Sequence, residues 1–209
     1  MTRIILHKEL FEYDSNIRRT YPVICGVDEA GRGPLAGDVY AAAAVLNDSV
    51  LIDYLNDSKK ISESRRETLY DEIIKKADAY CVAVATVAEI DKINILQATL
   101  LAMKRAVEGL GIKPDYALVD GNKLPELDIP AQCIVKGDAK SASIAAASVL
   151  AKVSRDRYMQ KIAEKYPEYC FEKHKGYGTE LHREMILKHG ASDIHRKTFL
   201  KKILKENDE

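Results

Sequence analysis

Four carboxylates follow apolar stretches at three separate places in this sequence. Asp28 and Glu29 end the apolar run of residues 23–27, and Asp120 and Asp138 each stand beside a glycine after a later apolar run. In an α/β sheet, ligands bind in the crevice outside the carboxyl ends of the strands, so we expect these acids to converge there. Carboxylates without cysteine or histidine among them favour Mg²⁺ or Mn²⁺ over zinc.

Such a set of acids suits the hydrolysis of phosphodiesters. Two divalent ions held about 4 Å apart can activate a water molecule and stabilise the leaving oxygen. A single aspartate beside a glycine is usually only a turn residue, so it is the coincidence of four acids at three predicted strand ends that indicates a metal site. Neighbours on a strand point to opposite faces, and Asp28 and Glu29 can serve one site only if the strand twists or ends at Glu29.

A glycine-rich segment, residues 31–37, follows the first two acids directly. Its glycines allow a ligand or another backbone to approach closely. The segment also fits the loose dinucleotide-binding pattern G-x-G-x-x-G/A, with Asp53 at about the expected distance. Pro34 inside the turn, the apolar run after it and the two preceding acids argue against a pyrophosphate site. A nucleotide cofactor is therefore the weaker interpretation.

Composition restricts the class of protein. With 209 residues and 46% apolar content, the chain fits one large domain or one domain with an appendage. It has no apolar run long enough to span a membrane, and its first residues lack the apolar core of a signal peptide. Four cysteines without Cys-x-x-Cys spacing indicate free thiols. We expect a cytoplasmic protein with no membrane partner and no structural zinc.

The charges are balanced overall but clustered locally. The formal net charge is zero, so the net charge of the molecule gives no indication of a polyanionic partner. A neutral chain that binds phosphates must therefore gather its basic residues on one face. Lys59 and Lys60 are candidate phosphate contacts, although a solvated loop explains them equally well. Residues 195–197 form a second basic cluster.

The elements that must position these residues follow from hydrophobic periodicity. Apolar and alternating runs predict strands over 23–29, 39–46, 80–87, 114–120 and 132–136. Helical patterns cover 8–21, 64–77, 93–110 and 141–166, with two further helices after residue 168. A capping box is expected at Ser64-x-x-Glu67, and Ser141 is expected to cap the long helix. The order predicts an α/β layer fold with a mixed sheet.

Taken together, the motifs resemble those of the ribonuclease HII family. The likeness covers about residues 22–199, in order, and its motifs are Gly26-Val-Asp-Glu-Ala-Gly-Arg-Gly-Pro-Leu-Ala-Gly37, Asp57-Ser-Lys-Lys60, Val119-Asp-Gly-Asn-Lys-Leu-Pro125, Lys136-Gly-Asp-Ala-Lys-Ser141, Ser143-Ile-Ala-Ala-Ala-Ser148, His174-Lys-Gly-Tyr-Gly-Thr179 and Ile194-His-Arg-Lys-Thr-Phe199. The resemblance implies a ribonuclease H-like fold, a five-stranded mixed sheet flanked by helices with a C-terminal helical extension. It implies an N-terminal helical segment (1–21), a catalytic domain (22–166) and a C-terminal helical substrate-binding part (167–209).

The same resemblance implies a role for individual residues. The family's metal-binding carboxylates fall on Asp28, Glu29, Asp120 and Asp138. Its Gly-Arg-Gly stretch, whose backbone contacts the ribose 2′-hydroxyl and nearby phosphates, falls on Gly31, Arg32 and Gly33. Tyr177 falls on the tyrosine that packs beside the ribonucleotide–deoxyribonucleotide step. Backbone groups exposed by glycine can reach a 2′-hydroxyl, the group that distinguishes RNA from DNA.

The resemblance further implies an activity. We expect a monomeric, Mg²⁺- or Mn²⁺-dependent endoribonuclease that cuts the RNA strand of RNA/DNA hybrids and the 5′ side of single ribonucleotides in duplex DNA. Two-metal hydrolysis would leave 3′-hydroxyl and 5′-phosphate ends and serve ribonucleotide removal in DNA replication and repair; no obligatory protein partner is indicated. The alternatives are a ribonuclease HIII or another ribonuclease H-like nuclease, and a non-catalytic hybrid-binding module. His174 and His195 are expected to be structural or DNA-facing rather than metal ligands.

Overall fold

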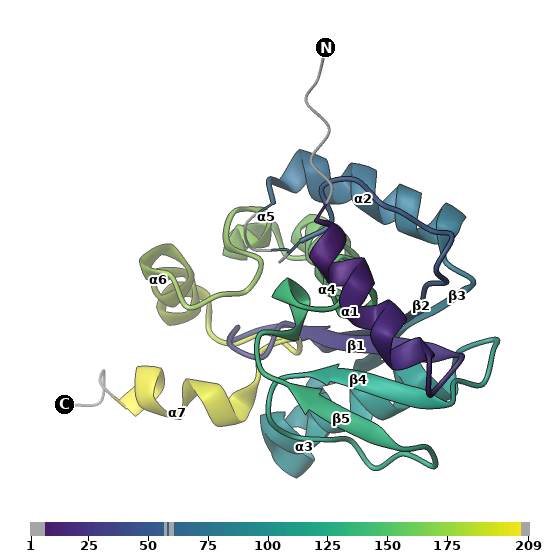
Figure 1. The fold of residues 1–209 in the computed structure, drawn as a ribbon. Helices are drawn as coiled ribbons and strands as arrows, with labels where there is room; N and C mark the ends of the chain where they lie inside the picture. Colours follow the sequence, from purple (N-terminus) through teal and green to yellow (C-terminus); the bar gives the residue numbers. More distant parts are fainter. Residues whose placement is uncertain (1–6, 57, 59–60, 206–209) are drawn as a thin grey trace.

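The core of the protein is a five-stranded mixed sheet (Figure 1). The computed structural model describes residues 7–56, 58 and 61–205, so Lys59 and Lys60 lie outside the described residues. The strands are β1 (Ile24–Ala30), β2 (Val39–Val45), β3 (Ala79–Ala85), β4 (Tyr116–Asp120) and β5 (Ala131–Ile134). They lie in the order β3-β2-β1-β4-β5, with β1–β2 and β2–β3 antiparallel and β1–β4 and β4–β5 parallel. The predicted fold class is confirmed.

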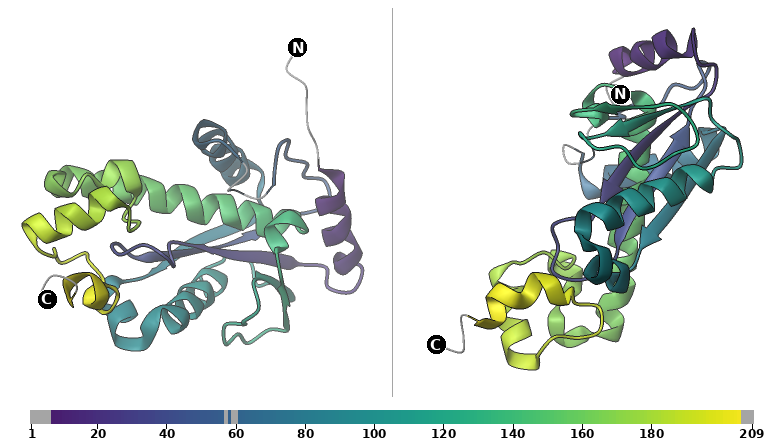
Figure 2. Two further views of the ribbon diagram at one scale, coloured as in Figure 1. Left: turned by 90° about the vertical axis from the view of Figure 1, so that its left-hand side faces the viewer. Right: turned by 90° about the horizontal axis from the view of Figure 1, so that it is seen from below.

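Helices cover both faces of the sheet (Figure 2). They are α1 (Lys8–Arg18), α2 (Glu63–Lys76), α3 (Val87–Glu108), α4 (Ala142–Lys165), α5 (Phe171–His174), α6 (Glu180–His189) and α7 (Lys197–Lys205). One face packs against α4, with α1 and α2 beside it, and the other packs against α3. The C-terminal helices α5, α6 and α7 lie at one end of the sheet. None of the helices in the described ranges is long and apolar enough to cross a membrane.

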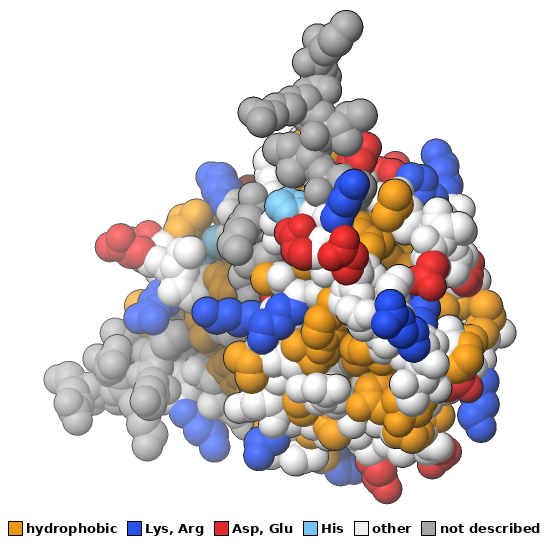
Figure 3. Space-filling model, viewed as in Figure 1, with side chains coloured by type: hydrophobic (Ala, Val, Ile, Leu, Met, Phe, Trp, Pro, Cys, Tyr) orange, Lys and Arg blue, Asp and Glu red, His pale blue; other side chains and the backbone are white. Residues whose placement is uncertain are grey.

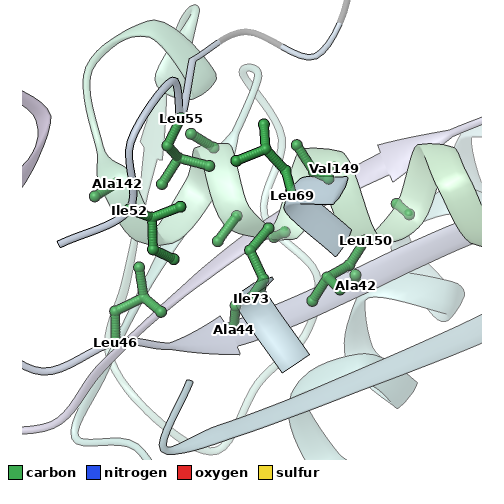
Figure 4. Packing of buried hydrophobic residues seen from close by; sticks show 14 of the residues in the cluster. Ala42, Ala44, Leu46, Ile52, Leu55, Leu69, Ile73, Ala142, Val149 and Leu150 are labelled. Atoms are coloured by element: carbon green, nitrogen blue, oxygen red, sulfur yellow. The ribbon is translucent and has the colours of Figure 1, made fainter. Parts of the chain in front are cut away.

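The alanine-rich run of residues 39–46 forms a central strand, as its length and flanking turns indicate. Ala41 and Ala43 of β2 pack toward α3, whereas Ala42 and Ala44 pack toward α4. Figure 4 shows Ala42 and Ala44 beside residues of α2 and α4 such as Leu69, Ile73 and Leu150. Because alanine is small, helices approach the strand closely on both of its faces.

Two helix starts differ from the sequence-based expectation. Helix α2 begins at Glu63, and its cap is Ser62, whose side chain accepts a hydrogen bond from the Arg65 amide, rather than Ser64. Helix α3 begins at Val87 instead of residue 93, after a capping box made by Thr86 and Glu89. Asn94 interrupts α3 with a φ of 68°, and its side chain accepts hydrogen bonds from two later amides of the helix. The predicted start near residue 93 is therefore this internal break.

The other helix predictions fare better. Ser141 caps α4 as expected, since its side chain accepts a hydrogen bond from the Ile144 amide. Three α-helices follow residue 168 in the described part of the chain, where two were predicted, because α5 is a single short turn. A separate apolar cluster joins this C-terminal part to α4 and to the glycine-rich segment through Ala36, Met159 and Phe171.

Gly26 sets the contact between β1 and α4. A Cβ atom added there would lie 2.0 Å from the carbonyl carbon of Ser143 at the start of α4. Gly26→Ala is therefore expected to push the helix off the strand and to lower the free energy of unfolding by about 3 kcal/mol or more, as measured by urea denaturation. Gly111→Ala is the matched control, because nothing lies within 4 Å of the added Cβ. Equal urea midpoints for the two variants would contradict this packing.

Candidate active site

The sheet places Asp28 and Asp120 side by side. Strands β1 and β4 are parallel neighbours, and Val27 pairs with Val119. The next residue of each strand is one of the two aspartates. Asp28 and Asp120 therefore lie together at the carboxyl ends of these strands. This is the arrangement that the positions of the acids at strand ends predict.

A short turn after β5 places Asp138 near the same carboxyl ends of the strands. Strand β5 runs parallel to β4, with Ile134 opposite Asp120. The chain then enters a 3-10 turn, Gly137–Ala139, directly before α4. The Gly137 amide donates a hydrogen bond to a carboxylate oxygen of Asp120 at 2.6 Å. Asp138 is thus the neighbour of the residue that binds Asp120, and its side chain is buried.

Asp28 lies in an electrostatically unfavourable place. Only 5% of the residue is exposed. Burial raises the pKa of its carboxyl group well above the ordinary value, and the charges of Glu29 and Asp120 raise it further. Hydrogen bonds from the Ser148 hydroxyl and the Glu29 amide lower the pKa but do not cancel the rise. Among the described residues, Arg32 pairs with Glu29 at 3.4 Å, but no cationic side chain offsets the raised pKa of Asp28.

The donor set fits a hard divalent cation. Every candidate ligand is a carboxylate, which is the ligand type that Mg²⁺ and Mn²⁺ prefer, and a cation would relieve the repulsion at Asp28. Among the residues that the structure describes, no three His, Cys, Asp or Glu side chains are already gathered as a formed metal site. The fit therefore rests on the chemistry of the donors and on the repulsion between them.

Asp28 and Glu29 line one cavity despite being neighbours in a strand. The cavity has a volume of about 220 Å³. Its lining comes from the end of β1, the glycine-rich segment, α4 and the C-terminal part, and consists of Asp28, Glu29, Ala30, Gly31, Arg32, Gly33, Ser58, Ser148, Lys152 and Tyr177. Both acids line this cavity although β1 does not end at Glu29 but continues to Ala30, which pairs with Tyr40 of β2. Asp28, Glu29, the glycine-rich segment and Tyr177 are brought together here, whereas Asp120 and Asp138 are not among the lining residues.

The glycine-rich segment, residues 31–37 and hereafter the glycine loop, folds around a buried arginine. Arg196 is completely buried and donates hydrogen bonds to the carbonyl oxygens of four loop residues at 2.6–3.0 Å, those of Gly31, Arg32, Pro34 and Gly37. Burial lowers its pKa to about 9, so it remains charged at pH 7. Strand β2, not a helix, follows the loop, which rules out the dinucleotide-binding interpretation.

This arrangement determines where the loop amides point. In a trans peptide the N–H lies opposite the preceding carbonyl. Since the carbonyls of Gly31 and Arg32 point to Arg196, the amides of Arg32 and Gly33 point away from it. Both of these residues also line the cavity. Two adjacent outward amides form a site suited to an oxygen-bearing ligand.

A second buried arginine connects the glycine loop to Tyr177. Arg155 of α4 donates to the carbonyls of Ala36 and Asp38 on one side and of Lys175 on the other. Its guanidinium carbon lies 5.9 Å from the ring centre of Tyr177, a residue that is 43% exposed. Gly31 has a φ of 95°, and a Cβ there would lie 2.1 Å from Arg155. The arginine therefore fills the space that this glycine leaves.

The sequence does not indicate the roles of Arg155 and Arg196, or the place of Lys152 in the cavity lining. Arg196 counted only as a member of a basic cluster, yet both His195 and Arg196 are buried. Arg155 is buried as well. Nothing in the residue type separates such an arginine from a solvated one. On the face shown in Figure 3, lysine and arginine side chains are scattered rather than gathered in one block.

Comparisons with known proteins identify the family. A family model described as ribonuclease HII matches residues 25–202. The chain belongs to the ribonuclease HII family. Ribonuclease HII of Caldicellulosiruptor saccharolyticus is 51% identical over 201 residues, which cover 96% of this chain and 98% of the relative. That of Delftia acidovorans is 59% identical over 177 residues, covering 85% of this chain and 75% of the relative.

A solved structure agrees with this assignment. Ribonuclease H2 from Pyrococcus horikoshii superposes with a TM-score of 0.72 at 28% identity and covers 90% of this chain and 99% of its own. The predicted family and enzyme class are confirmed. As a member of the ribonuclease HII family, the protein is a metal-dependent endonuclease of the ribonuclease H type, which cleaves RNA in RNA/DNA hybrids.

Proposed function

We propose that this member of the ribonuclease HII family cuts on the 5′ side of a ribonucleotide, including a single ribonucleotide in duplex DNA, and leaves 3′-hydroxyl and 5′-phosphate ends. The observation that carries the proposal is the composition of the cavity lining. Asp28 and Glu29 line the same cavity as Gly31, Arg32, Gly33 and Tyr177. A carboxylate site for the phosphate chemistry thus adjoins groups that can test the sugar.

The residues take separate roles in this proposal. Asp28, Glu29, Asp120 and Asp138 would hold two Mg²⁺ or Mn²⁺ ions. When bound, the ions supply activation of the attacking water and stabilisation of the leaving 3′-oxygen. The Ser148 hydroxyl orients Asp28 by donating a hydrogen bond to it, and the Gly137 amide does the same for Asp120.

Recognition of the sugar falls to the glycine loop. Gly31, Arg32 and Gly33 present backbone groups to the 2′-hydroxyl and the adjacent phosphates, and the tyrosine ring packs beside the junction with DNA. A Cβ placed on Gly33 would lie 3.7 Å from a ring carbon of Tyr177, so the two elements border the same space. Selection would depend on sugar identity and duplex shape rather than on base sequence.

The same proposal assigns separate roles to the segments of the chain. Residues 22–166 would carry the chemistry and residues 167–209 would bind substrate, after an N-terminal helical segment, residues 1–21. Cytoplasmic action on ribonucleotide-containing DNA during replication and repair completes the proposal. Free, widely spaced cysteines are compatible with that compartment.

An incision assay tests the proposal. The substrate is a DNA duplex with one ribonucleotide, offered with Mg²⁺, with Mn²⁺ or with a chelator. The native protein should cut on the 5′ side of the ribonucleotide only with metal, and Asp120→Asn should lower kcat/KM by about a thousandfold because a ligand charge is lost. Asp128→Asn, which changes an exposed aspartate in the loop before β5, should cut normally. Incision in chelator, or an Asp120→Asn variant as active as the control, would overturn the proposal.

A further inference from the structure

Three buried histidines pack near the segment that carries Tyr177 and do not line the cavity. His174, His182 and His195 are 7%, 0% and 1% exposed. The rings of His174 and His182 stack with centres 4.3 Å apart, and those of His182 and His195 lie 5.2 Å apart. Phe171 contacts all three rings. We call these three residues the histidine cluster.

Backbone groups determine the direction of each hydrogen bond in the cluster. The Ser192 amide lies 3.0 Å from Nδ1 of His195, and because an amide only donates, this nitrogen must accept. Nε2 of a neutral His195 then carries the proton and faces Nε2 of His182 at 3.1 Å. That nitrogen accepts, so the proton of His182 is on Nδ1, which donates to the Tyr177 carbonyl at 2.9 Å.

The chain of hydrogen bonds requires neutral rings, and the rings are neutral. Burial lowers the pKa of both His182 and His195 to about 4. At pH 7 each ring therefore has one donor and one acceptor, which is what the chain from Ser192 to Tyr177 uses. A fully satisfied buried chain of this kind permits one orientation of its members, whereas apolar side chains of similar size would permit several.

His174 fixes the other side of Tyr177. Its Nδ1 accepts a hydrogen bond from the Gly176 amide at 3.2 Å, so its Nε2 donates to the Tyr169 carbonyl at 2.9 Å. Gly176 has a φ of 84°, and a Cβ there would lie 2.6 Å from the carbonyl oxygen of Ala36. The segment that carries Tyr177 is thus pressed against the glycine loop and held from behind by the cluster.

The same C-terminal segment contacts both the glycine loop and the segment that carries Tyr177. His195 pairs with Ala36 in an isolated bridge, and the Arg196 amide donates to the Leu35 carbonyl. The side chain of Arg196 holds the glycine loop, while that of its neighbour His195 starts the chain to Tyr177. Two adjacent residues therefore place the loop and the tyrosine relative to each other.

We propose that His182 and His195 are positioning residues that hold Tyr177 beside the glycine loop and thereby set the preference of the enzyme for a ribonucleotide–deoxyribonucleotide junction over continuous RNA. This inference rests on the proposed junction-reading role of Tyr177. Neither histidine lines the cavity. Their effect passes through the backbone carbonyl of Tyr177.

The test compares kcat/KM on two substrates, a DNA duplex with a single ribonucleotide and a continuous RNA/DNA hybrid. His182→Leu removes the donor to Tyr177 and should lower the junction-to-hybrid ratio about fivefold to tenfold, the effect of one lost hydrogen bond. His182→Asn places an amide N–H near the position of Nδ1 and should restore most of the ratio. The exposed His189 provides the control, and His189→Leu should leave the ratio unchanged.

The ratio separates positioning from a merely structural role, because a smaller folded fraction lowers both rates equally. Thermal midpoints are measured for every variant. If His182→Leu does not fold, His195→Gln, which keeps an N–H toward His182, and His195→Leu, which does not, provide the same comparison one step further along the chain. Equal ratios within either pair would overturn the inference.

A double variant distinguishes this inference from the function on which it depends. Tyr177→Ala should lower the ratio, and His182→Leu/Tyr177→Ala should lower it no further, because the two changes remove one effect. An unchanged ratio in Tyr177→Ala would refute the role of the tyrosine, and the inference with it. A lowered ratio in Tyr177→Ala with a normal ratio in His182→Leu would refute the positioning role alone.

Discussion

Replacing Asp28 by asparagine is expected to abolish cleavage and, at the same time, to stabilise the metal-free protein. Loss of a ligand charge should lower kcat/KM by about a thousandfold. The native carboxyl is buried beside Glu29 and Asp120, and its raised pKa means that folding disfavours its charged form. Each unit of such a shift corresponds to about 1.4 kcal/mol. In chelator, the thermal midpoint of Asp28→Asn should rise by about 2 °C or more at pH 7.

The pH dependence gives this prediction a definite sign. A carboxyl whose pKa is raised by folding binds its proton more tightly in the folded protein, so it makes stability increase as pH falls from neutral toward its unfolded value near 3.8. The buried His182 and His195 act in the opposite sense, because they lose stability as pH falls below about 6.5. The stability advantage of Asp28→Asn should therefore shrink steadily on acidification, since only Asp28 differs between the two proteins.

Asp128→Asn is the matched control for this experiment, as it removes an exposed carboxylate. Its thermal midpoint in chelator should stay within about 1 °C of the native value, as for most surface changes. A lower midpoint for Asp28→Asn than for this control would show that the charge of Asp28 is not strained in the absence of metal. Repulsion between the carboxylates would then no longer support a metal site at this place.

The second large effect is expected at Arg196. Lysine keeps the positive charge but replaces a rigid fork by a single ammonium group, which cannot reach carbonyls in four directions. Arg196→Lys should leave some of the buried loop carbonyls without a donor, each at a cost of about 1–3 kcal/mol. The loop amides would lose their fixed direction. We expect kcat/KM on the single-ribonucleotide duplex to fall at least about tenfold, together with a lower urea midpoint.

Arg183→Lys is the control, because Arg183 is an exposed arginine of the same C-terminal part that donates to one carbonyl, that of Gly178. It should retain stability and activity. If Arg196→Lys cuts as well as this control, the loop does not need the arginine fork. A loss of stability without any loss of activity per folded molecule would mean that the arginine supports the fold but not the direction of the amides.

The fold was accessible from sequence because its signals are local and repeated. Apolar runs between turns predict all five strands, and the alanine-rich second run was distinguished from a helix by its length. Helix starts were less accessible. Ser62 and Ser64 are both acceptable caps by composition, and the break at Asn94 depends on a φ of 68° that the sequence pattern does not display. Tertiary packing decides between such options.

Some residues of the candidate site could likewise be predicted from sequence, and others could not. Carboxylates at strand ends can be placed from sequence, since the topology of the sheet brings those ends together. Arg155 and Arg196 could not be found, because an arginine in a helix or near a basic cluster usually faces water, and their carbonyl partners are more than 100 residues away for most contacts. The histidine cluster is likewise assembled from separate segments of the C-terminal part.

The contact between Gly31 and Arg196 joins residues 165 positions apart. A ribosome makes the chain from its N-terminus, so all four carboxylates emerge before the arginine that shapes the glycine loop. A product that stops short of residue 196 has every candidate metal-binding acid but lacks the arginine that orients the loop amides, which we propose contact the sugar. On the proposed function, competence to recognise a ribonucleotide is therefore acquired late in biosynthesis, when the C-terminal segment docks.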